Sequence, residues 1–259
     1  MAQTPWSVRF IEEKSGPCTP EGGCATRRTD LPRDLREIHI MQPKDLSREA
    51  QQIGRRLKGF ERILMTWRPR ICPFHILMEY IPAGSKILDI GCGNGLWLLM
   101  LSRLGRISSG VGLEVDQAKI STANSLKQPS DPLRFIRDNG GEDWPAGCDC
   151  LSIIDVLHHV PREQQQMFLQ RIVNTHTERI IFKDIDPKPK LTRFLNTCHD
   201  LVLARQIPKY CTPAKVQAWL HEIGYSVQRC DRADMVWYSH YLIVADKTKR
   251  RHMGVKTQR

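Results

Sequence analysis

The segment Lys86–Trp97 constrains the fold of this chain more than any other part of the sequence. A short apolar run ends at Asp89-Ile90, glycines follow at positions 91, 93 and 95, and a second apolar stretch begins at Leu96. This order predicts a buried strand, a turn that another group approaches closely, and the N-terminus of a helix. Such a turn is suited to hold the sugar and polar tail of a nucleotide-like ligand.

The spacing of the glycines narrows the kind of ligand. A dinucleotide-binding turn places its third glycine three residues after the second, whereas Gly91, Gly93 and Gly95 alternate here. The segment resembles motif I of the class I S-adenosylmethionine-dependent methyltransferases, an aliphatic run followed by Asp-x-Gly-x-Gly-x-Gly. The resemblance implies S-adenosylmethionine as the cofactor, with the Asp89 carboxylate facing its amino group. It assigns cofactor contacts to Asp89, Gly91, Cys92, Gly93, Asn94 and Gly95. A plain turn is the alternative, but it would not require the backbone entropy that three glycines cost.

Length and composition are those of a globular protein with one core. The 259 residues can bury one core with an appended cap, and a chain with 41% hydrophobic and 26% charged residues has an ordinary globular balance. Residues 1–10 have no apolar core of signal-peptide length, and no run approaches a membrane span. Nine scattered cysteines favour reduced thiols over disulfides or zinc. We therefore expect a cytoplasmic protein.

The net charge of +11 is concentrated at the C-terminus. Residues 247–259 contain six basic residues and no acid, which predicts a disordered basic tail. Residues 1–40 are rich in proline and have little periodicity, so we expect an irregular arm that folds over the cofactor site. The sequence therefore divides into an N-terminal arm and cap helix (1–69), a methyltransferase domain (70–246) and a basic tail (247–259).

A helix is predicted over residues 45–69, ending before Pro69. Its apolar residues keep the spacing of a stripe that faces the core, and they are Ile53, Leu57, Phe60, Leu64 and Trp67. Its basic residues, Arg55, Arg56, Lys58 and Arg62, fall on the opposite side. A solvated basic face is favoured here over a patch for nucleic acid or membrane.

Strands and helices alternate in the rest of the chain, which predicts a parallel sheet covered on both faces. Strands are expected at 87–90, 110–114, 133–137, 150–155, 179–184, 225–230 and 237–245. Helices are expected at 73–80, 94–104, 117–126, 163–173, 191–205 and from Pro213 to Gly224. Because the last two strands are joined by a short connection, they should be antiparallel. The predicted fold class is thus α/β: a doubly wound, seven-stranded, mostly parallel Rossmann-like sheet that ends in an antiparallel hairpin, as the resemblance also implies.

The resemblance extends to the ends of the second and third strands. Glu114 stands where the family places an acidic residue that accepts hydrogen bonds from both ribose hydroxyls, and Val115 follows it. Asp116 fits a helix cap better. Asp138 and Asn139 match the family's segment near the adenine, where an aspartate takes the exocyclic amino group. Asn139-Gly140-Gly141 fits an ordinary loop equally well.

After the fourth strand comes Asp155-Val156-Leu157-His158-His159, which is similar to the Leu-His-His tract of many small-molecule methyltransferases. This strand end meets both cofactor and substrate in such a sheet, so Asp155 is a predicted cofactor contact. A histidine can accept a proton near neutrality, and His159 is the candidate substrate contact or general base. For His158 a structural packing role is favoured.

Other polar residues near strand ends carry weaker predictions. Asp155, Asp184 and Asp186 are potential cation ligands, but the Asp-Asn pair of the catechol-type enzymes is missing, so no metal is predicted. The adjacent His199 and Asp200 point in different directions on a helix and are not a dyad. Tyr210, Trp237, Tyr238 and His240 are candidates for the substrate pocket or for the core.

Several absences bear on the acceptor. The fourth strand ends neither in an Asn/Asp-Pro-Pro-aromatic tract nor in a Pro-Cys or Thr-Cys nucleophile, which disfavours the common base-methylating classes. The predicted function is methyl transfer from S-adenosylmethionine to a small hydroxylated or amino metabolite. One alternative is an RNA methyltransferase that grips phosphates with the tail and the Arg55–Arg62 face. A second alternative is a non-catalytic cofactor-binding or assembly protein.

Overall fold

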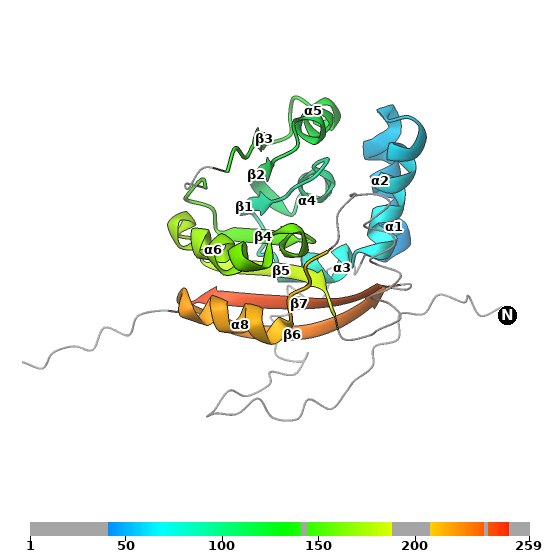
Figure 1. The fold of residues 1–259 in the computed structure, drawn as a ribbon. Helices are drawn as coiled ribbons and strands as arrows, with labels where there is room; N and C mark the ends of the chain where they lie inside the picture. Colours follow the sequence, from blue (N-terminus) through cyan, green and yellow to red (C-terminus); the bar gives the residue numbers. More distant parts are fainter. Residues whose placement is uncertain (1–40, 141–143, 188–207, 236–237, 249–259) are drawn as a thin grey trace, which may run out of the picture.

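A seven-stranded sheet forms the centre of the computed structural model (Figure 1), which describes residues 41–140, 144–187, 208–235 and 238–248. Its strands run in the order β3-β2-β1-β4-β5-β7-β6. They are β1 (Ser85–Ile90), β2 (Ile107–Glu114), β3 (Leu133–Arg137), β4 (Cys150–Ile154), β5 (Arg179–Ile185), β6 (Tyr225–Met235) and β7 (Tyr238–Lys247). This confirms the predicted fold class.

The strand directions place the site. β1 pairs in parallel with β2 on one side and with β4 on the other, so the strand order reverses between β1 and β4. β2 with β3 and β4 with β5 are also parallel pairs, whereas β7 is antiparallel to both β5 and β6. In open α/β sheets the crevice at such a reversal, at the carboxyl ends of the strands, is where ligands bind.

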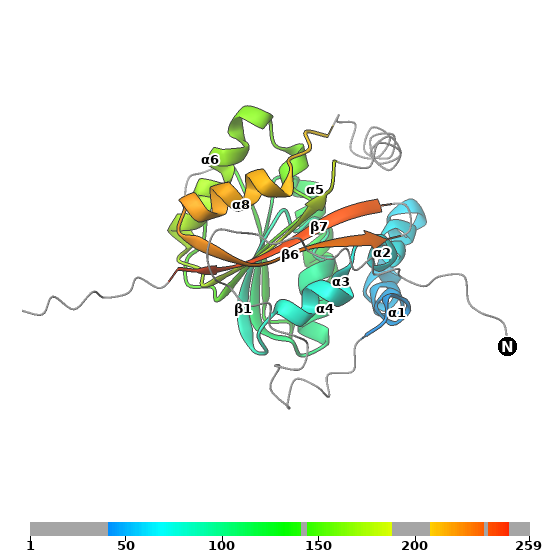
Figure 2. The ribbon, with the colours of Figure 1, turned by 90° about the horizontal axis from the view of Figure 1, so that it is seen from below.

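Helices cover both faces of the sheet (Figure 2). One face carries α1 (Pro43–Ile53), α3 (Phe74–Leu77), α4 (Leu96–Arg103) and α5 (Gln117–Leu126), whose apolar residues share one core cluster. The other face carries α6 (Gln165–Gln170) and α8 (Pro213–Glu222). Short 3-10 helices supplement them at Gly54–Arg56 (η3), Met78–Tyr80 (η4), Leu157–His159 (η5), Arg162–Gln164 (η6) and Arg171–Thr175 (η7).

Alternation along the strands builds the two cores. Ile87 of β1 lies in the cluster with α4, and its neighbour Leu88 lies in the cluster with α6 and α8. Both side chains are buried, as expected for strands covered on both faces. Leu46 and Ala50 of α1 belong to the first cluster, so α1 packs into the same core as the sheet. None of the described helices is long and apolar enough to cross a membrane.

Most predicted elements are present with adjusted ends. The helix at 117–126 matches α5, and the Asp116 side chain accepts from the Ala118 N–H at 2.8 Å, which confirms the cap. α8 begins at Pro213 after Thr212, although the Thr212 side chain makes no capping hydrogen bond. The predicted 163–173 helix is replaced by three short pieces, η6, α6 and η7, that end where His176 adopts a left-handed conformation. The predicted 191–205 helix, which includes His199 and Asp200, lies outside the described residues, and β7 includes Lys247 of the predicted tail.

The prediction of one helix over 45–69 is wrong. α1 ends at Ile53, η3 follows, and α2 (Gly59–Ile71) begins at Gly59, whose φ of +56° favours glycine. Gly54 allows the close packing, because a Cβ there would lie 3.0 Å from the Met65 sulfur. Pro69 does not end α2 but lies buried inside it. The predicted core-facing stripe is right for Ile53 and Leu57, which pack in the core. It is wrong for Phe60, Leu64 and Trp67, which are exposed.

Candidate functional site

The turn between β1 and α4 is anchored to the end of β2. The N–H groups of Gly91 and Cys92 both donate to the Leu113 carbonyl, at 2.7 and 2.9 Å. Both ends of the turn require glycine, because Gly91 and Gly95 have positive φ angles. Packing adds a second reason: a Cβ at Gly91 would lie 2.5 Å from Val156, and a Cβ at Gly95 would lie 2.6 Å from Phe135. The turn therefore packs closely against two neighbouring segments.

Gly93, in the middle of the turn, differs from its neighbours. Its φ is +55°, but no atom lies within 4 Å of where its Cβ would be. The positive φ favours glycine at this position, and the open space leaves room for a ligand to lie against the backbone. The open space at Gly93 fits the cofactor that motif I implies.

The Glu114 carboxylate fixes the geometry beside Gly93. One oxygen accepts from the Gly93 N–H at 3.0 Å, and the other accepts from the N–H groups of Val115 and Asp116 at 2.9 and 3.1 Å. The side chain is 7% exposed. Glu114 thus joins the end of β2 to the glycine turn and keeps acceptor capacity beyond these bonds, since an ionised carboxylate has about four lone-pair sites.

Asp89 lies buried at the end of β1. Its Oδ1 accepts from the Ser152 hydroxyl of β4 at 2.6 Å. Burial raises the pKa of Asp89 to about 7, and the nearby Glu114 charge adds to the increase. In the described part of the chain neither of these two carboxylates forms an ion pair with a basic side chain, so a positively charged ligand would be stabilised between them.

The Cys92 thiol packs against β2 and donates to the Gly93 carbonyl at 3.7 Å. A Cβ on Gly112 of β2 would lie 2.8 Å from its sulfur. Burial raises the pKa of this thiol well above its ordinary value, so it is neither a nucleophile nor a thiolate ligand. At Cys92 a ligand in the turn would therefore contact the backbone rather than the thiol.

The predicted adenine-side residues lie at the ends of β2 and β3. Val115 is 64% exposed. The two oxygens of Asp138 accept from the Gly140 N–H at 2.9 Å and from the Trp144 indole N–H at 3.2 Å. Asn139 is exposed. The strand ends therefore present an apolar side chain and a half-buried carboxylate, the chemistry that a purine ring with an amino group requires.

A buried charge cluster occupies the ends of β4 and β5. Asp155 has a φ of +59°, a conformation that strains most residues other than glycine. Its oxygens bind Lys183 of β5 at 2.5 Å and Arg68 of α2 at 2.6 Å. Burial alone would raise the pKa of Asp155, but Lys183 and then Arg68 hold it well below its ordinary value. Asp155 is therefore a carboxylate held by two cations.

His158 and His159 have different surroundings. His158 is buried; its Nδ1 lies 2.5 Å from Asp184 Oδ1, and its backbone N–H donates to Asp184 Oδ2 at 3.1 Å. This confirms the structural role favoured for His158. His159 is exposed, and its ring centroid lies 4.1 Å from that of His158. The exposed imidazole thus rests on a neighbour that a carboxylate holds in place.

Three potential metal ligands, Asp155, His158 and Asp184, have atoms within 4.8 Å of one another. Asp155 already binds two cationic side chains, and Asp184 accepts from His158 and from the Ile185 N–H at 2.7 Å. The negative charge is compensated by the protein itself, so this donor set does not suit a divalent cation.

Comparison with known proteins decides the family. The family model described as methyltransferase domain matches residues 63–229, more than half of the chain. The chain belongs to the methyltransferase domain family. It is a class I enzyme with S-adenosylmethionine as its cofactor, as the motif predicted.

The relatives are distant but cover most of this methyltransferase. The ubiquinone biosynthesis O-methyltransferase of Saccharophagus degradans is 22% identical in an alignment of 209 residues that covers 73% of this chain and 86% of the relative. The enzyme of the same name from Pseudomonas aeruginosa PAO1 is 24% identical in an alignment of 198 residues that covers 65% of this chain and 82% of the relative. Magnesium protoporphyrin IX methyltransferase from Synechocystis PCC 6803, with bound SAH, has a TM-score of 0.59 at 16% identity and covers 76% of this chain and 94% of its own. At that identity the likeness shows the fold alone.

The sequence reasoning missed four polar residues that shape the site of this methyltransferase. Ser152 and Lys183 interrupt the apolar runs of β4 and β5, and that interruption was the available signal. Arg68 reaches the site from α2, 87 residues away from Asp155. The buried Gln165 amide donates to the Leu157 and Lys209 carbonyls at 3.1 and 2.6 Å, which ties η5 to the segment around Tyr210. For Arg68 and Gln165, the neighbouring sequence gives no indication of these contacts.

His240 and Tyr210, two candidates for the substrate pocket or the core, have different surroundings. His240 is buried in β7, where its Nε2–H donates to the Ile71 carbonyl at 2.9 Å. Burial, followed by the Lys183 charge, lowers the pKa of His240 to about 3. Tyr210 lies near His158, with ring centroids 6.5 Å apart. Trp237 and the side chain of Tyr238 lie outside the described residues.

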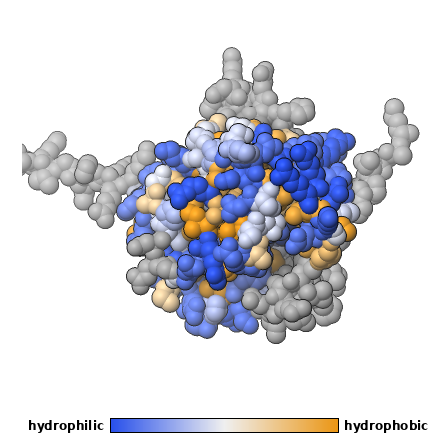
Figure 3. Space-filling model, turned by 90° about the horizontal axis from the view of Figure 1, so that it is seen from above, coloured by the Kyte–Doolittle hydropathy of each residue, from blue (hydrophilic) through white to orange (hydrophobic). Residues whose placement is uncertain are grey.

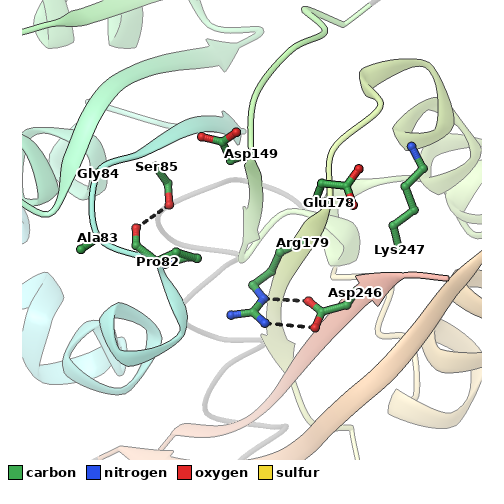
Figure 4. A pocket seen from close by; sticks show the side chains of 9 residues that line it. All are labelled: Pro82, Ala83, Gly84, Ser85, Asp149, Glu178, Arg179, Asp246 and Lys247. Carbon is green, nitrogen blue, oxygen red and sulfur yellow. Dashed lines mark hydrogen bonds and ion pairs between the residues drawn. The ribbon is translucent and has the colours of Figure 1, made fainter. Parts of the chain in front are cut away.

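A hollow of about 420 Å³ lies at the opposite edge of the sheet (Figure 4). Its walls come from the starts of β1 and β5 and the end of β7, and Arg179 and Asp246 form a two-bonded ion pair within one wall. In α/β sheets ligands bind at the carboxyl ends of the strands. We therefore do not assign this hollow to the methyltransferase site.

Proposed function

We propose that this methyltransferase methylates a small molecule at a hydroxyl group or, less favourably, at an amino group. The observation that carries the proposal is the exposed His159 imidazole resting on the buried His158–Asp184 pair at the carboxyl edge, next to the glycine turn. The relatives named as O-methyltransferases support a hydroxyl acceptor.

We assign the cofactor contacts as follows. Asp89 faces the positively charged amino group; its burial and its bond to the Ser152 hydroxyl, with no ion pair to a basic side chain in the described residues, support this. Glu114 accepts from the ribose hydroxyls. The backbone of the turn, Gly91, Cys92, Gly93, Asn94 and Gly95, lies along the cofactor.

The adenine lies between Val115 and the Asp138-Asn139 segment, and Asp138 takes the exocyclic amino group. Asp155 contributes through its backbone, because both of its oxygens already bind cations.

Bound S-adenosylmethionine supplies a methyl group on a positively charged sulfur, which is already activated for transfer. His159 accepts the proton of the acceptor hydroxyl as the oxygen–carbon bond forms, and the electrons of the carbon–sulfur bond remain with sulfur. Asp184 holds His158, and His158 supports the His159 ring in position. The other task of the site is to align acceptor, methyl and sulfur in line and to exclude water.

The cofactor site is tested by Gly93→Val. Valine would fill the open space and strain the backbone, so we expect at least about 100-fold weaker binding of S-adenosylhomocysteine by calorimetry. Gly84→Val is the matched control, because Gly84 also has a positive φ, +74°, and open space around its Cβ but lies at the opposite edge. Equal binding by both variants would contradict the assignment.

The acceptor is tested with a deuterated-methyl cofactor and three sets of acceptors: phenols and alcohols, matched primary amines, and RNA. Mass spectrometry should find the label on a hydroxyl compound. Label found only on RNA would support the alternative in which RNA is the substrate. Cofactor binding without transfer to any acceptor would support the non-catalytic alternative.

A further inference from the structure

Helix α2 carries an apolar face that points away from the protein. Phe60, Ile63, Leu64 and Trp67 are 59%, 55%, 37% and 51% exposed. In the described part of the chain seven large hydrophobic side chains are exposed, and four of them belong to this one helix. Scattered apolar residues on a surface are ordinary, whereas a cluster on one element indicates a binding surface.

This apolar face is separate from the face of α2 that packs against the protein. Positions 60, 63, 64 and 67 fall within about one-third of the helix circumference. The residues that α2 buries, Met65 and Pro69, lie on the opposite side, and Met65 packs against Gly54 of η3. α2 therefore has one apolar side for the protein and a second one left for a partner.

Basic residues are concentrated in and just before α2, and one of them, Arg70, borders the apolar face. Five exposed basic residues lie in α2 and the segment before it, against one exposed acid, Glu61. They are Arg55, Arg56, Lys58, Arg62 and Arg70. The Arg70 guanidinium lies 4.5 Å from the centre of the Trp67 ring, so the charge directly borders the apolar face. Figure 3 shows hydrophobic patches beside strongly hydrophilic ones on the face seen from above.

We propose that α2 docks on an anionic lipid bilayer. Phe60, Ile63, Leu64 and Trp67 would enter the boundary between headgroups and acyl chains, and the arginines and lysine would meet the lipid phosphates. Helices that lie in a membrane interface combine these features: aromatic and aliphatic residues on one side, Lys and Arg around them.

Charge and residue type favour this occupant over three others. Nucleic acid would pair with the basic residues and stack on the aromatic ones, but it gives no role to Ile63 and Leu64. A second copy of the chain would bring the same positive charge to the contact. Residues 1–40 carry six basic and six acidic residues, so they offer no net complementary charge.

Docking would place the membrane beside the catalytic edge. Arg68 lies on the same helix and its Nη2 binds Asp155 at 2.6 Å, and the His240 ring holds the last carbonyl of α2. A bilayer bound to α2 therefore lies next to the ends of β4 and β5. The docking proposal does not depend on which acceptor the enzyme methylates, because vesicle binding can be measured without any methyl transfer.

The experiment is sedimentation of the full chain with large unilamellar vesicles. We expect at least about tenfold tighter binding to vesicles with about one-third phosphatidylglycerol than to pure phosphatidylcholine, and weaker binding at high salt. Ile63→Ser/Trp67→Ser should weaken binding by at least about tenfold. Met167→Ser/Val173→Ser is the matched control, because it removes two exposed hydrophobic residues elsewhere and should leave binding unchanged. Arg70→Gln should weaken binding to anionic vesicles and reduce its salt dependence.

Other outcomes overturn the proposal. They are no vesicle binding at low salt, equal loss in the Met167/Val173 control, or loss only in a tail variant, Lys249→Gln/Arg250→Gln/Arg251→Gln. A dimer in light scattering that Ile63→Ser/Trp67→Ser dissociates would assign the face to a second copy. RNA binding that needs the arginines but not Ile63 would assign it to nucleic acid. Circular dichroism and the thermal midpoint check that each variant is folded.

Discussion

The glycine turn after β1 and the ends of β4 and β5 lie at the same edge of the sheet, but different interactions hold them. Backbone N–H groups fix the turn, donating to the Leu113 carbonyl and to Glu114. Buried charged side chains fix the ends of β4 and β5, where Asp155 binds Lys183 and Arg68. The first arrangement leaves carboxylates ready for a cation, and the second neutralises its own carboxylate. The glycine turn can therefore bind a positively charged ligand group, whereas the ion pairs at the ends of β4 and β5 hold that part of the site in place.

The largest expected effect comes from removing the fully buried cation at the ends of β4 and β5. Lys183→Met leaves the half-buried Asp155 with Arg68 alone, so the free energy of unfolding should fall by about 3 kcal/mol. Urea denaturation measures it. Lys119→Met is the control, because Lys119 is exposed on α5 and should change stability by less than about 0.5 kcal/mol.

A double variant sharpens this prediction. Lys183→Met/Asp155→Asn removes both charges, and asparagine tolerates the left-handed backbone at this position. We expect it to regain more than half of the lost stability. If the double variant were no more stable than Lys183→Met, the loss would come from packing rather than from an uncompensated charge.

The same contrast explains how much the sequence could predict. The glycine turn, Asp89 and Glu114 are joined by contacts between the ends of two adjacent strands, and their spacing along the chain contains the geometry. β1 to β5 follow from apolar runs between polar turns. The fold and the turn of the cofactor site were therefore predictable from residue type and spacing.

The rest depends on contacts between distant segments. Arg68 meets Asp155 across 87 positions, and no local pattern shows which arginine of α2 turns inward. The apolar spacing of residues 53–67 spans two helices that are separated by the turn at Gly54–Gly59, so Ile53 is buried whereas Phe60, Leu64 and Trp67 are exposed. Periodicity shows that a helix has an apolar face but not what covers it.

The acceptor half gives the next prediction. His159→Gln should lower kcat/KM for a hydroxyl acceptor by about 100-fold while the affinity for the cofactor stays unchanged. The pH–rate profile should lose the acidic limb that a histidine base produces. His221→Gln is the control, because His221 is an exposed histidine on α8. Unchanged turnover by His159→Gln would remove His159 from the chemistry and leave positioning as the contribution of this half.

The smallest effect concerns the cofactor half and depends on pH. The pKa of Asp89 is raised from 3.8 to about 7, so between these values the folded protein binds the proton and the unfolded chain does not. Stability therefore falls as pH rises from 3.8 to about 7, and the full loss is present above it. An asparagine side chain does not titrate, so Asp89→Asn should gain about 2 kcal/mol over the natural protein between pH 5 and pH 8.

Cofactor binding should show the opposite ranking. Binding of a positively charged amino group requires the Asp89 carboxylate to be ionised, so affinity for S-adenosylhomocysteine should rise by up to about tenfold per unit as pH rises toward 7. In Asp89→Asn the affinity should be lower and nearly independent of pH. Urea denaturation and calorimetry at pH 5 and pH 8 measure both effects on the same samples. If Asp89→Asn were more stable at pH 8 and still bound the cofactor as well as the natural protein, the Asp89 carboxylate would have no role in cofactor binding. If the variant were more stable but bound the cofactor more weakly, the protein would keep this carboxylate for the ligand at a cost in stability.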